Sequence, residues 1–239
     1  MKKKILHIVT NVERYASVDK PTGLWLGELT HAYDEFEKQN YQQDIASPKG
    51  GRTPIDPRSL GRMVLDKSIR ARQSDTTFMA LLDNTPAIAD VDWRDYDAIY
   101  YTGGHGVMWD FLDDAKLQEI SRNIYENGGV VSSVCHGFCG LLNIRLSDGS
   151  RLINGKTITG YSWFEEIAAG VAKAVPYNAE KIAKEHGASY VKTLFPFVPY
   201  AVADGALITG QNPFSAKPAA KKVIEFLSSS SETKSHPAE

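Results

Sequence analysis

Short apolar runs alternate with longer segments in which apolar residues recur at helical spacing. The runs are rich in β-branched and aromatic residues and have the length of buried parallel strands, at residues 5–9, 44–47, 98–102, 130–134 and 207–210. Apolar spacing near 3.6 predicts the main helices over 24–36, 115–126 and 214–227. Strands that alternate with helices predict an α/β fold, with a mostly parallel sheet covered by helices on both faces.

Other segments predict smaller elements around this sheet. Residues 48–57 hold three prolines and two glycines, which predicts an irregular loop, and one or two helices are expected over 60–89. The whole insert, about 48–89, is expected to form a lid or subdomain over a site. Further predictions are helices over 162–169 and 176–186, a hairpin of 152–153 with 157–159 around Asn154-Gly155, and pairing of 190–194 with 200–203. Residues 228–239 are polar and are expected to form a flexible tail.

Composition narrows the class of protein. The 239 residues show no linker-like stretch, so residues 1–227 are expected to form a single domain. A net charge of −2 without a basic patch argues against nucleic acid as a partner, and no apolar stretch is long enough to span a membrane. Two cysteines four residues apart make no disulfide framework, and the apolar run after the basic N-terminus is too short for a signal peptide. These features predict a cytoplasmic protein.

One stretch carries the clearest chemical signal. Gly128-Gly129 opens the strand 130–134, and Cys135-His136-Gly137 follows it directly, before apolar residues at helical spacing. Cys135 is therefore predicted at a sharp strand-to-helix turn, in a strained conformation, at the carboxyl end of the sheet. A helix N-terminus favours an anion, so we expect a lowered pKa and a nucleophilic thiolate. The alternative is a buried structural cysteine.

A thiolate nucleophile needs an orienting base and donors for an oxyanion. His136 can turn beside the thiol if a carboxylate holds its far nitrogen, and Glu165 or Glu166 could supply that carboxylate. Gly103-Gly104-His105-Gly106 ends the preceding strand, so the N–H groups of Gly104 and His136 could bind an oxyanion together.

Two residues leave alternatives open. Glu28 has apolar neighbours four residues to either side, which allows an inward orientation, although a solvated position is the usual expectation for a single helix glutamate. Cys139 could form a soft-metal or redox pair with Cys135, although helix packing is the better interpretation. The histidines show no metal-ligand spacing and no phosphate-binding fingerprint is present, so no metal and no cofactor are predicted.

Four motifs together resemble one superfamily. They are Val-Cys-His-Gly after a strand, Gly-Gly-His-Gly upstream, Gly-x-x-x-Gly-Glu near the N-terminus and Ile-Thr-Gly-Gln-Asn-Pro near the C-terminus. This combination resembles the PfpI-type, class I glutamine amidotransferase-like superfamily from Lys3 to about Leu227. The insert and the adjacent His136 look like its heat-shock chaperone and glutathione-independent glyoxalase branch. The resemblance implies a flavodoxin-like three-layer sandwich and usually a homodimer.

The resemblance also implies roles for individual residues. Cys135 is the nucleophile, His136 its partner and an oxyanion donor with Gly104, and Glu28 the acid beside the sulfur, expected to be protonated near neutral pH. Glu166 suits the third position better than Glu165. His105, Trp163 and Phe164 are expected to line the substrate pocket. The sequence departs from the family at Gly137-Phe138-Cys139-Gly140, where many glyoxalase members have Gly-Pro-Ala, which leaves the pocket shape and the substrate open.

The implied activity is conversion of methylglyoxal to D-lactate without glutathione or metal, with removal of aldehyde adducts (deglycase activity) as a related possibility. Cys135 would form a hemithioacetal and Glu28 would carry a proton between the two adjacent carbons. Hydrolysis of an amide or small peptide by the same thiolate remains an alternative, so the substrate is a small aldehyde or an amide. A holdase chaperone without turnover is the alternative from another class. It would use apolar surface around the aromatic residues Trp163, Phe164, Phe195, Phe197 and Tyr200.

Overall fold

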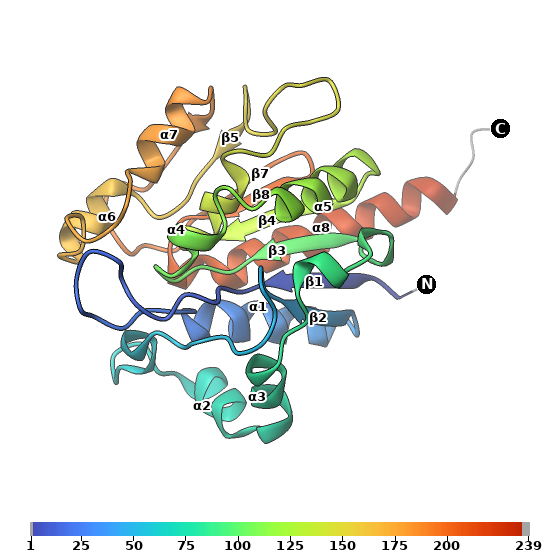
Figure 1. Cartoon of the computed structure of the whole chain (residues 1–239). Helices are drawn as coiled ribbons and strands as arrows, with labels where there is room; N and C mark the ends of the chain where they lie inside the picture. The colour runs from blue at the N-terminus through green and yellow to red at the C-terminus, as the bar shows by residue number, and fades with distance from the viewer. Residues whose placement is uncertain (1, 236–239) are drawn as a thin grey trace.

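Six strands form the central sheet of the computed structural model, which describes residues 2–235 (Figure 1). The order is β2–β1–β3–β4–β8–β7. The strands are β1 (Lys4–Ile8), β2 (Gln42–Ala46), β3 (Ala98–Tyr101), β4 (Val130–Val134), β7 (Ala201–Asp204) and β8 (Leu207–Gly210). All pairs are parallel except β7 with β8. The predicted α/β fold with a mostly parallel sheet is confirmed, and β4 lies in its interior.

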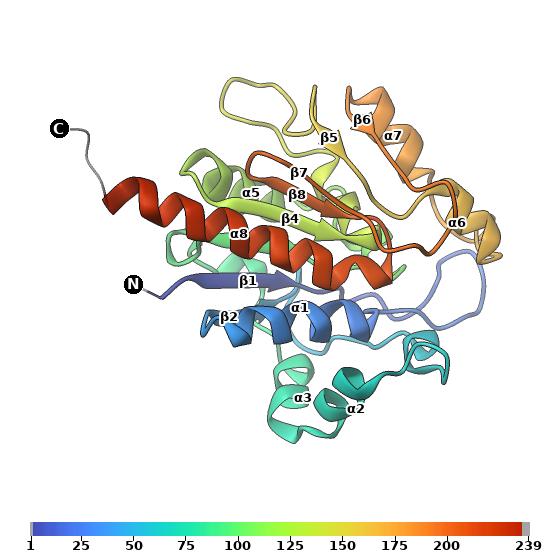
Figure 2. The same ribbon diagram turned by 180° about the vertical axis from the view of Figure 1, so that it is seen from behind.

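Helices cover both faces of this sheet. On one face α1 (Leu26–Lys38) and α8 (Ala216–Ser235) lie side by side, as Figure 2 shows from behind. On the other face lie α4 (Val107–Asp110) and α5 (Ala115–Glu126). The carboxylate of Asp114 caps α5 by accepting from the backbone N–H groups of Lys116 and Leu117, at 2.9 and 2.8 Å. None of the helices in residues 2–235 has the length and apolarity needed to cross a membrane.

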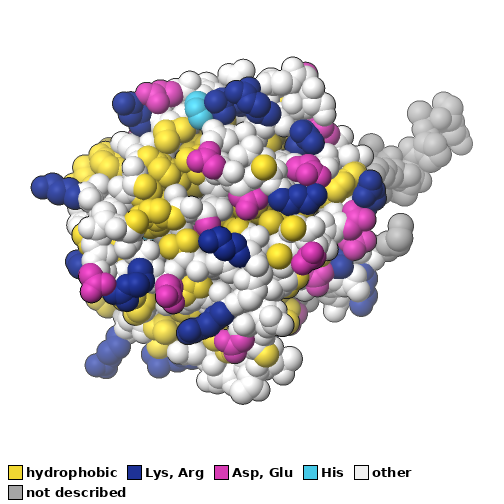
Figure 3. Space-filling view, viewed as in Figure 1, with side chains coloured by type: hydrophobic (Ala, Val, Ile, Leu, Met, Phe, Trp, Pro, Cys, Tyr) yellow, Lys and Arg dark blue, Asp and Glu magenta, His cyan; other side chains and the backbone are white. Residues whose placement is uncertain are grey.

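The surface seen in Figure 3 mixes charges of both signs, and hydrophobic side chains gather toward the end where α6 (Trp163–Ala168) and α7 (Ala179–Glu185) lie. Exposed apolar side chains include Phe164 and Ile167 in α6, together with Leu194 and Phe195 in the segment that precedes β7. Exposed apolar groups of this size are compatible with an interface, although single ones are normal on a monomer.

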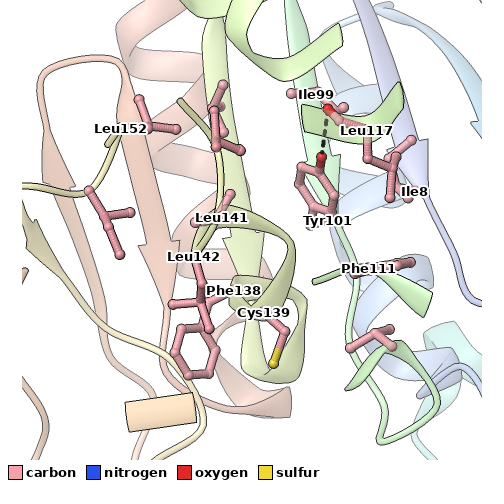
Figure 4. Packing of buried hydrophobic residues seen from close by; sticks show 14 of the residues in the cluster. Ile8, Ile99, Tyr101, Phe111, Leu117, Phe138, Cys139, Leu141, Leu142 and Leu152 are labelled. Atoms are coloured by element: carbon pink, nitrogen blue, oxygen red, sulfur yellow. Dashed lines mark hydrogen bonds between the residues drawn. The ribbon is translucent and has the colours of Figure 1, made fainter. Parts of the chain in front are cut away.

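The chain after β4 is anchored in the larger core cluster. Cys135–Leu141 form a 3₁₀ helix, and Phe138, Cys139 and Leu141 are fully buried (Figure 4). Across the cluster, the hydroxyl of Tyr101 donates to the carbonyl of Leu117 at 3.3 Å. Full burial of each large apolar side chain contributes roughly 1.5–3 kcal/mol, so the turn that carries Cys135 is held firmly.

The insert between β2 and β3 lies beside α1. It contains the 3₁₀ turn Pro57–Leu60, helices α2 (Lys67–Ser74) and α3 (Thr76–Asp83), and short 3₁₀ turns at Ile88–Asp90 and Trp93–Asp95. The predicted one or two helices are confirmed. Leu24, just before α1, donates its N–H to the carbonyl of Pro54 at 2.8 Å and accepts from the N–H of Asp56 at 2.9 Å. These bonds tie the loop at residues 54–58 to the start of α1.

The two predicted strand pairings in the last third of the chain are wrong. Leu152-Ile153 lie in a turn, and β5 (Thr157–Ile158) pairs in parallel with β6 (Ser189–Tyr190), because the N–H of Gly155 bonds instead to the carbonyl of Gly187 at 2.9 Å. Residues 201–204 pair with β8 and not with 190–194. The turn between β7 and β8 holds Gly205 at a φ of 61°, and such a local Asp-Gly hairpin forms more readily than a pairing across a long loop.

The C-terminal helix is longer than predicted. α8 continues to Ser235 after the 3₁₀ turn Pro213–Ser215, so the expected tail is wrong for residues 228–235, while residues 236–239 lie outside the described part. Helices α6 and α7 agree with the predicted helices at 162–169 and 176–186.

Candidate active site

Cys135 occupies the predicted elbow at the end of β4. Its φ is +56°, in the left-handed region that costs a residue with a side chain roughly 1–3 kcal/mol. The chain turns so closely there that a Cβ on Gly137 would lie 2.3 Å from the carbonyl oxygen of Tyr101. The predicted strain at Cys135 is confirmed, and only a glycine fits at position 137.

His136 connects the thiol to a buried carboxylate. Its Nδ1 lies 3.3 Å from the Sγ of Cys135, and its Nε2 lies 2.6 Å from Oε1 of Glu166. Burial alone would raise the pKa of Glu166, but the imidazoles of His136 and His105 outweigh it and lower that pKa to about 2. Glu166 is therefore ionised and acts as acceptor, so it holds a proton on Nε2 of His136 and leaves Nδ1 facing the sulfur.

The neighbouring Glu165 has a different place. Its Oε2 accepts from both the N–H and the hydroxyl of Ser162, at 3.0 and 2.8 Å, in a capping box at the start of α6. Its Oε1 accepts from the N–H of Phe197 at 2.9 Å and from the side-chain amide of Asn212 at 3.0 Å. Of the two glutamates that the sequence left open, Glu166 contacts His136 and Glu165 holds the loop at Phe197.

Glu28 lies on the first turn of α1 and is completely buried. Its Oε2 accepts from the N–H of Gly103 at 2.7 Å, and Oε1 has no such partner among the described residues. Burial raises the pKa of Glu28 from 4.5 to about 8, against the lowering effects of the Cys135 thiol and of Gly103. The side chain points inward, the less usual of the two orientations that the sequence left open, and is protonated near neutral pH.

The expected lowering of the Cys135 pKa is wrong. Burial, followed by the charge and the hydrogen bond of Glu28, raises the pKa of this thiol well above its ordinary value, and only the N–H of His136 acts in the opposite direction. The short 3₁₀ turn after Cys135 does not outweigh desolvation. The resting thiol therefore keeps its proton, and the neighbouring Nδ1 of His136 is the base placed to receive it.

A cavity of about 170 Å³ opens beside the sulfur. Its walls come from the elbow, the insert, the loop before β7, the 3₁₀ turn before α8 and the segments that precede α1, follow β3 and precede α6. The lining residues are Trp25, Val64, Gly104, His105, Cys135, His136, Tyr161, Phe197, Pro213 and Phe214. His105 thus lies in this wall, whereas Trp163 and Phe164 line a separate hollow. They point away because Glu165 and Glu166 take the buried side of α6. The N–H of Gly104 has no acceptor among residues 2–235, and the Gly104 backbone forms part of the wall.

A second group of residues, from the insert and the first loop, was missed at the sequence level. Nη2 of Arg58 donates to Nδ1 of His105 at 3.0 Å, and Nε2 of His105 lies 3.1 Å from Oε2 of Glu166. Arg58 is held by the buried Asp56 and by the hydroxyl of Tyr15. Nothing in the local sequence marks these residues, because only the path of the insert brings them to the site.

His105, His136 and Glu166 also form a group of potential metal ligands, with ligand atoms within 4.8 Å of one another. The hydrogen bonds oppose this use. Since Arg58 can only donate, Nδ1 of His105 accepts, and the ring proton lies on Nε2, the atom that a metal would need. This arrangement favours proton transfer over metal binding.

Comparison with known proteins gives a consistent result. Residues 23–226 match the model of the DJ-1/PfpI family. The chain is 32% identical to "Glutathione-independent glyoxalase HSP31" of Saccharomyces cerevisiae, over 95% of this chain and 98% of that protein. It is 33% identical to "Glyoxalase 3" of Candida albicans, over 94% and 98%.

Solved structures agree with these relatives. The fold superposes on the Rapid Encystment Protein 24 KDa of Francisella tularensis with a TM-score of 0.90 at 35% identity, covering 94% of this chain and 99% of that one. It superposes on glyoxalase III of Candida albicans with a TM-score of 0.87 at 31% identity, covering 94% and 97%. A cysteine elbow on a mostly parallel sheet, a matching family model and relatives aligned over nearly their full lengths lead to one conclusion: the chain belongs to the DJ-1/PfpI family.

Proposed function

We propose that this protein is a glutathione-independent glyoxalase that converts methylglyoxal and water to D-lactate. Relatives that carry this activity in their names align over almost the whole chain. The observation that carries the proposal is Glu28, a completely buried carboxyl with a pKa of about 8 beside Cys135. Isomerising an α-oxoaldehyde requires a proton carrier next to the covalent intermediate, whereas simple amide hydrolysis requires no such third group.

In the first step, Sγ of Cys135 attacks the aldehyde carbon of methylglyoxal. The thiol proton passes to Nδ1 of His136, 3.3 Å away, and the carboxylate of Glu166 stabilises the resulting imidazolium. The alkoxide formed from the aldehyde oxygen then takes this proton from His136 and becomes the hydroxyl of a hemithioacetal. The N–H groups of Gly104 and His136 are proposed to stabilise the charge that develops on this oxygen.

In the second step, Glu28 moves hydrogen between the two carbons. Because a pKa of about 8 leaves Glu28 mostly protonated near neutral pH, the step uses the minority of molecules in which it is ionised. That carboxylate removes the proton from the former aldehyde carbon and returns it to the neighbouring carbon, while the two oxygens exchange a proton, so that the hemithioacetal becomes a lactoyl thioester. A carboxylate with a pKa near 8 is a stronger base than an ordinary one by roughly a thousandfold. Delivery from one fixed side chain gives a single stereoisomer.

In the third step, water cleaves the thioester. His136 accepts a proton from the attacking water, the thiolate leaves and takes that proton from His136, and lactic acid loses a proton to the solvent. The sequence adds one water to methylglyoxal without net oxidation or reduction. The cavity of about 170 Å³, with largely apolar walls, suits a three-carbon aldehyde better than a peptide.

The setting of the activity is also proposed. We expect a homodimer, because apolar side chains such as Leu194 and Phe195 are exposed. Both cysteines are free, which is compatible with a reducing compartment such as the cytoplasm. The same exposed side chains keep a holdase chaperone as the second candidate function.

Parallel assays separate these functions. Purified protein without glutathione is given methylglyoxal, a panel of model amides, or an aggregating client protein. We expect turnover of the aldehyde, its complete loss in Cys135→Ala and its retention in Cys139→Ala. Turnover of the amides alone would overturn the proposal in favour of a hydrolase. Protection of the client by Cys135→Ala, with no turnover by the parent, would favour the holdase.

A further inference from the structure

Two imidazoles compete for one carboxylate in this site. Oε1 of Glu166 faces Nε2 of His136 at 2.6 Å, and Oε2 faces Nε2 of His105 at 3.1 Å. The two rings lie close, with centroids 4.1 Å apart. If His105 became an imidazolium, it would form its own ion pair with Glu166 and repel a second charge on His136. A base at His136 therefore depends on a neutral His105.

Arg58 controls which atom of His105 carries the proton. A guanidinium has only donors and stays charged, so its 3.0 Å contact with Nδ1 occupies the lone pair that a second proton would need. Asp56 holds the guanidinium through Oδ1 at 3.0 Å from Nε and Oδ2 at 2.5 Å from Nη2, and the hydroxyl of Tyr15 accepts from Nη2 at 2.8 Å. The guanidinium cannot turn away without breaking this set of bonds.

We propose that Arg58 is a positioning residue that keeps His105 neutral, so that the negative charge of Glu166 serves His136 during thiol deprotonation. The inference rests on the proposed role of His136 as the base for Cys135. Arg58 does not line the cavity beside the sulfur, and it acts only through His105 and Glu166.

The charges around His105 agree with this role. Burial first, and then the neighbouring His136, lower the pKa of His105 to about 4, with Glu166 opposing and Arg58 adding to the decrease. The other groups near the ring are Asp56 behind Arg58 and the tyrosines Tyr15 and Tyr161. Without Arg58, the Nδ1 lone pair is free, and protonation of His105 becomes easier as the pH falls.

The test variant is Arg58→Met. Arg52→Met is the control, because Arg52 lies exposed on the same insert and its substitution removes the same charge. We expect Arg58→Met to lower kcat for methylglyoxal by about tenfold with KM changed less than about twofold, and to move the acid limb of the kcat profile to higher pH. Arg52→Met should behave like the parent. An increase in KM without a decrease in kcat, or an unchanged acid limb, would overturn the proposal.

A rescue variant separates positioning from general structural damage. The side chain of His105→Gln can accept from Arg58 with its oxygen and donate to Glu166 with its nitrogen, and it cannot be protonated. In the His105→Gln background, Arg58→Met should therefore lower kcat by less than about twofold. An equal loss in both backgrounds would mean that Arg58 only holds the fold. If Arg58→Met unfolds because Asp56 is left unpaired, Asp56→Asn/Arg58→Met is used in its place.

A readout without turnover distinguishes this inference from the proposed function. Nitrogen-15 spectra of the imidazoles should place the proton of His105 on Nε2 in the parent and show protonation at higher pH in Arg58→Met. A proton on Nδ1 in the parent would overturn the inference even if D-lactate forms. If the parent forms no D-lactate, the spectra still decide the role of Arg58.

Discussion

Substitution of Glu28 by glutamine separates the chemistry of this site from its stability. The amide oxygen of Glu28→Gln can still accept from the N–H of Gly103, now 2.7 Å from Oε2, and the amide nitrogen can face the sulfur of Cys135. The side chain keeps its shape and polarity but loses the exchangeable acidic proton. Turnover of methylglyoxal should fall by about 10²–10⁴, the range of general acid–base losses.

The same substitution should stabilise the protein at alkaline pH. The carboxyl of Glu28 has a pKa of about 8 in the folded protein, against 4.5 ordinarily, so the folded state binds a proton that the unfolded chain releases. Stability is therefore unaffected below the unfolded pKa and falls as pH rises between these two values. Linkage gives a penalty of about 3 kcal/mol at pH 7 and about 5 kcal/mol well above pH 8. Glutamine removes this penalty.

Urea denaturation at pH 5 and at pH 8.5, together with a D-lactate assay, measures both effects. The unfolding free energy of Glu28→Gln should lie within about 1 kcal/mol of the parent value at pH 5 and exceed it by several kcal/mol at pH 8.5. Glu35→Gln is the control, since Glu35 lies on the same helix and pairs with Lys38 at 2.7 Å. Parental turnover by Glu28→Gln, or an identical pH dependence of unfolding in both proteins, would refute the reasoning.

Three further predictions follow from the same geometry. Glu166→Gln should lower turnover by at least about tenfold with little change in the urea unfolding curve. Glu165→Gln should instead lower the unfolding free energy by roughly 1–3 kcal/mol. The reverse pattern would mean that the two glutamates have exchanged roles. Iodoacetamide labelling, mapped by mass spectrometry, should reach Cys135 before Cys139, because Cys135 lines the cavity and has His136 beside it as a base, whereas Cys139 does not line that cavity; equal labelling would contradict this difference. Gly103→Ala should abolish turnover, because its Cβ would lie 2.7 Å from Oε2 of Glu28; a fully active variant would contradict the close approach.

The local sequence pattern was sufficient to predict the elbow at Cys135. A β-branched run followed by Cys135-His136-Gly137 determines both the strand and the turn, since neighbouring residues alone impose them. Glu28 required more, because helical spacing only allowed an inward position, and its contact with Gly103 depends on β1 lying next to β3.

Other features depended on competition between distant segments. Trp163 and Phe164 were expected to line the substrate pocket, yet two buried carboxylates that form hydrogen bonds occupy the inner side of α6. Arg58 escaped notice because its partner His105 is 47 residues away. The predicted pKa of the Cys135 thiol was wrong because the local sequence indicates only the favourable dipole at the start of a helix. Desolvation depends on all the residues that pack around the sulfur.

The most direct test of the central claim compares methylglyoxal lost with D-lactate gained. Purified protein in glutathione-free buffer should form D-lactate in an amount equal to the aldehyde consumed, over many turnovers, and Cys135→Ala should form none. Surface lysines and arginines can consume methylglyoxal without releasing lactate, so loss of the aldehyde alone is not sufficient. Aldehyde consumption without D-lactate, or equal D-lactate from Cys135→Ala, would contradict the account.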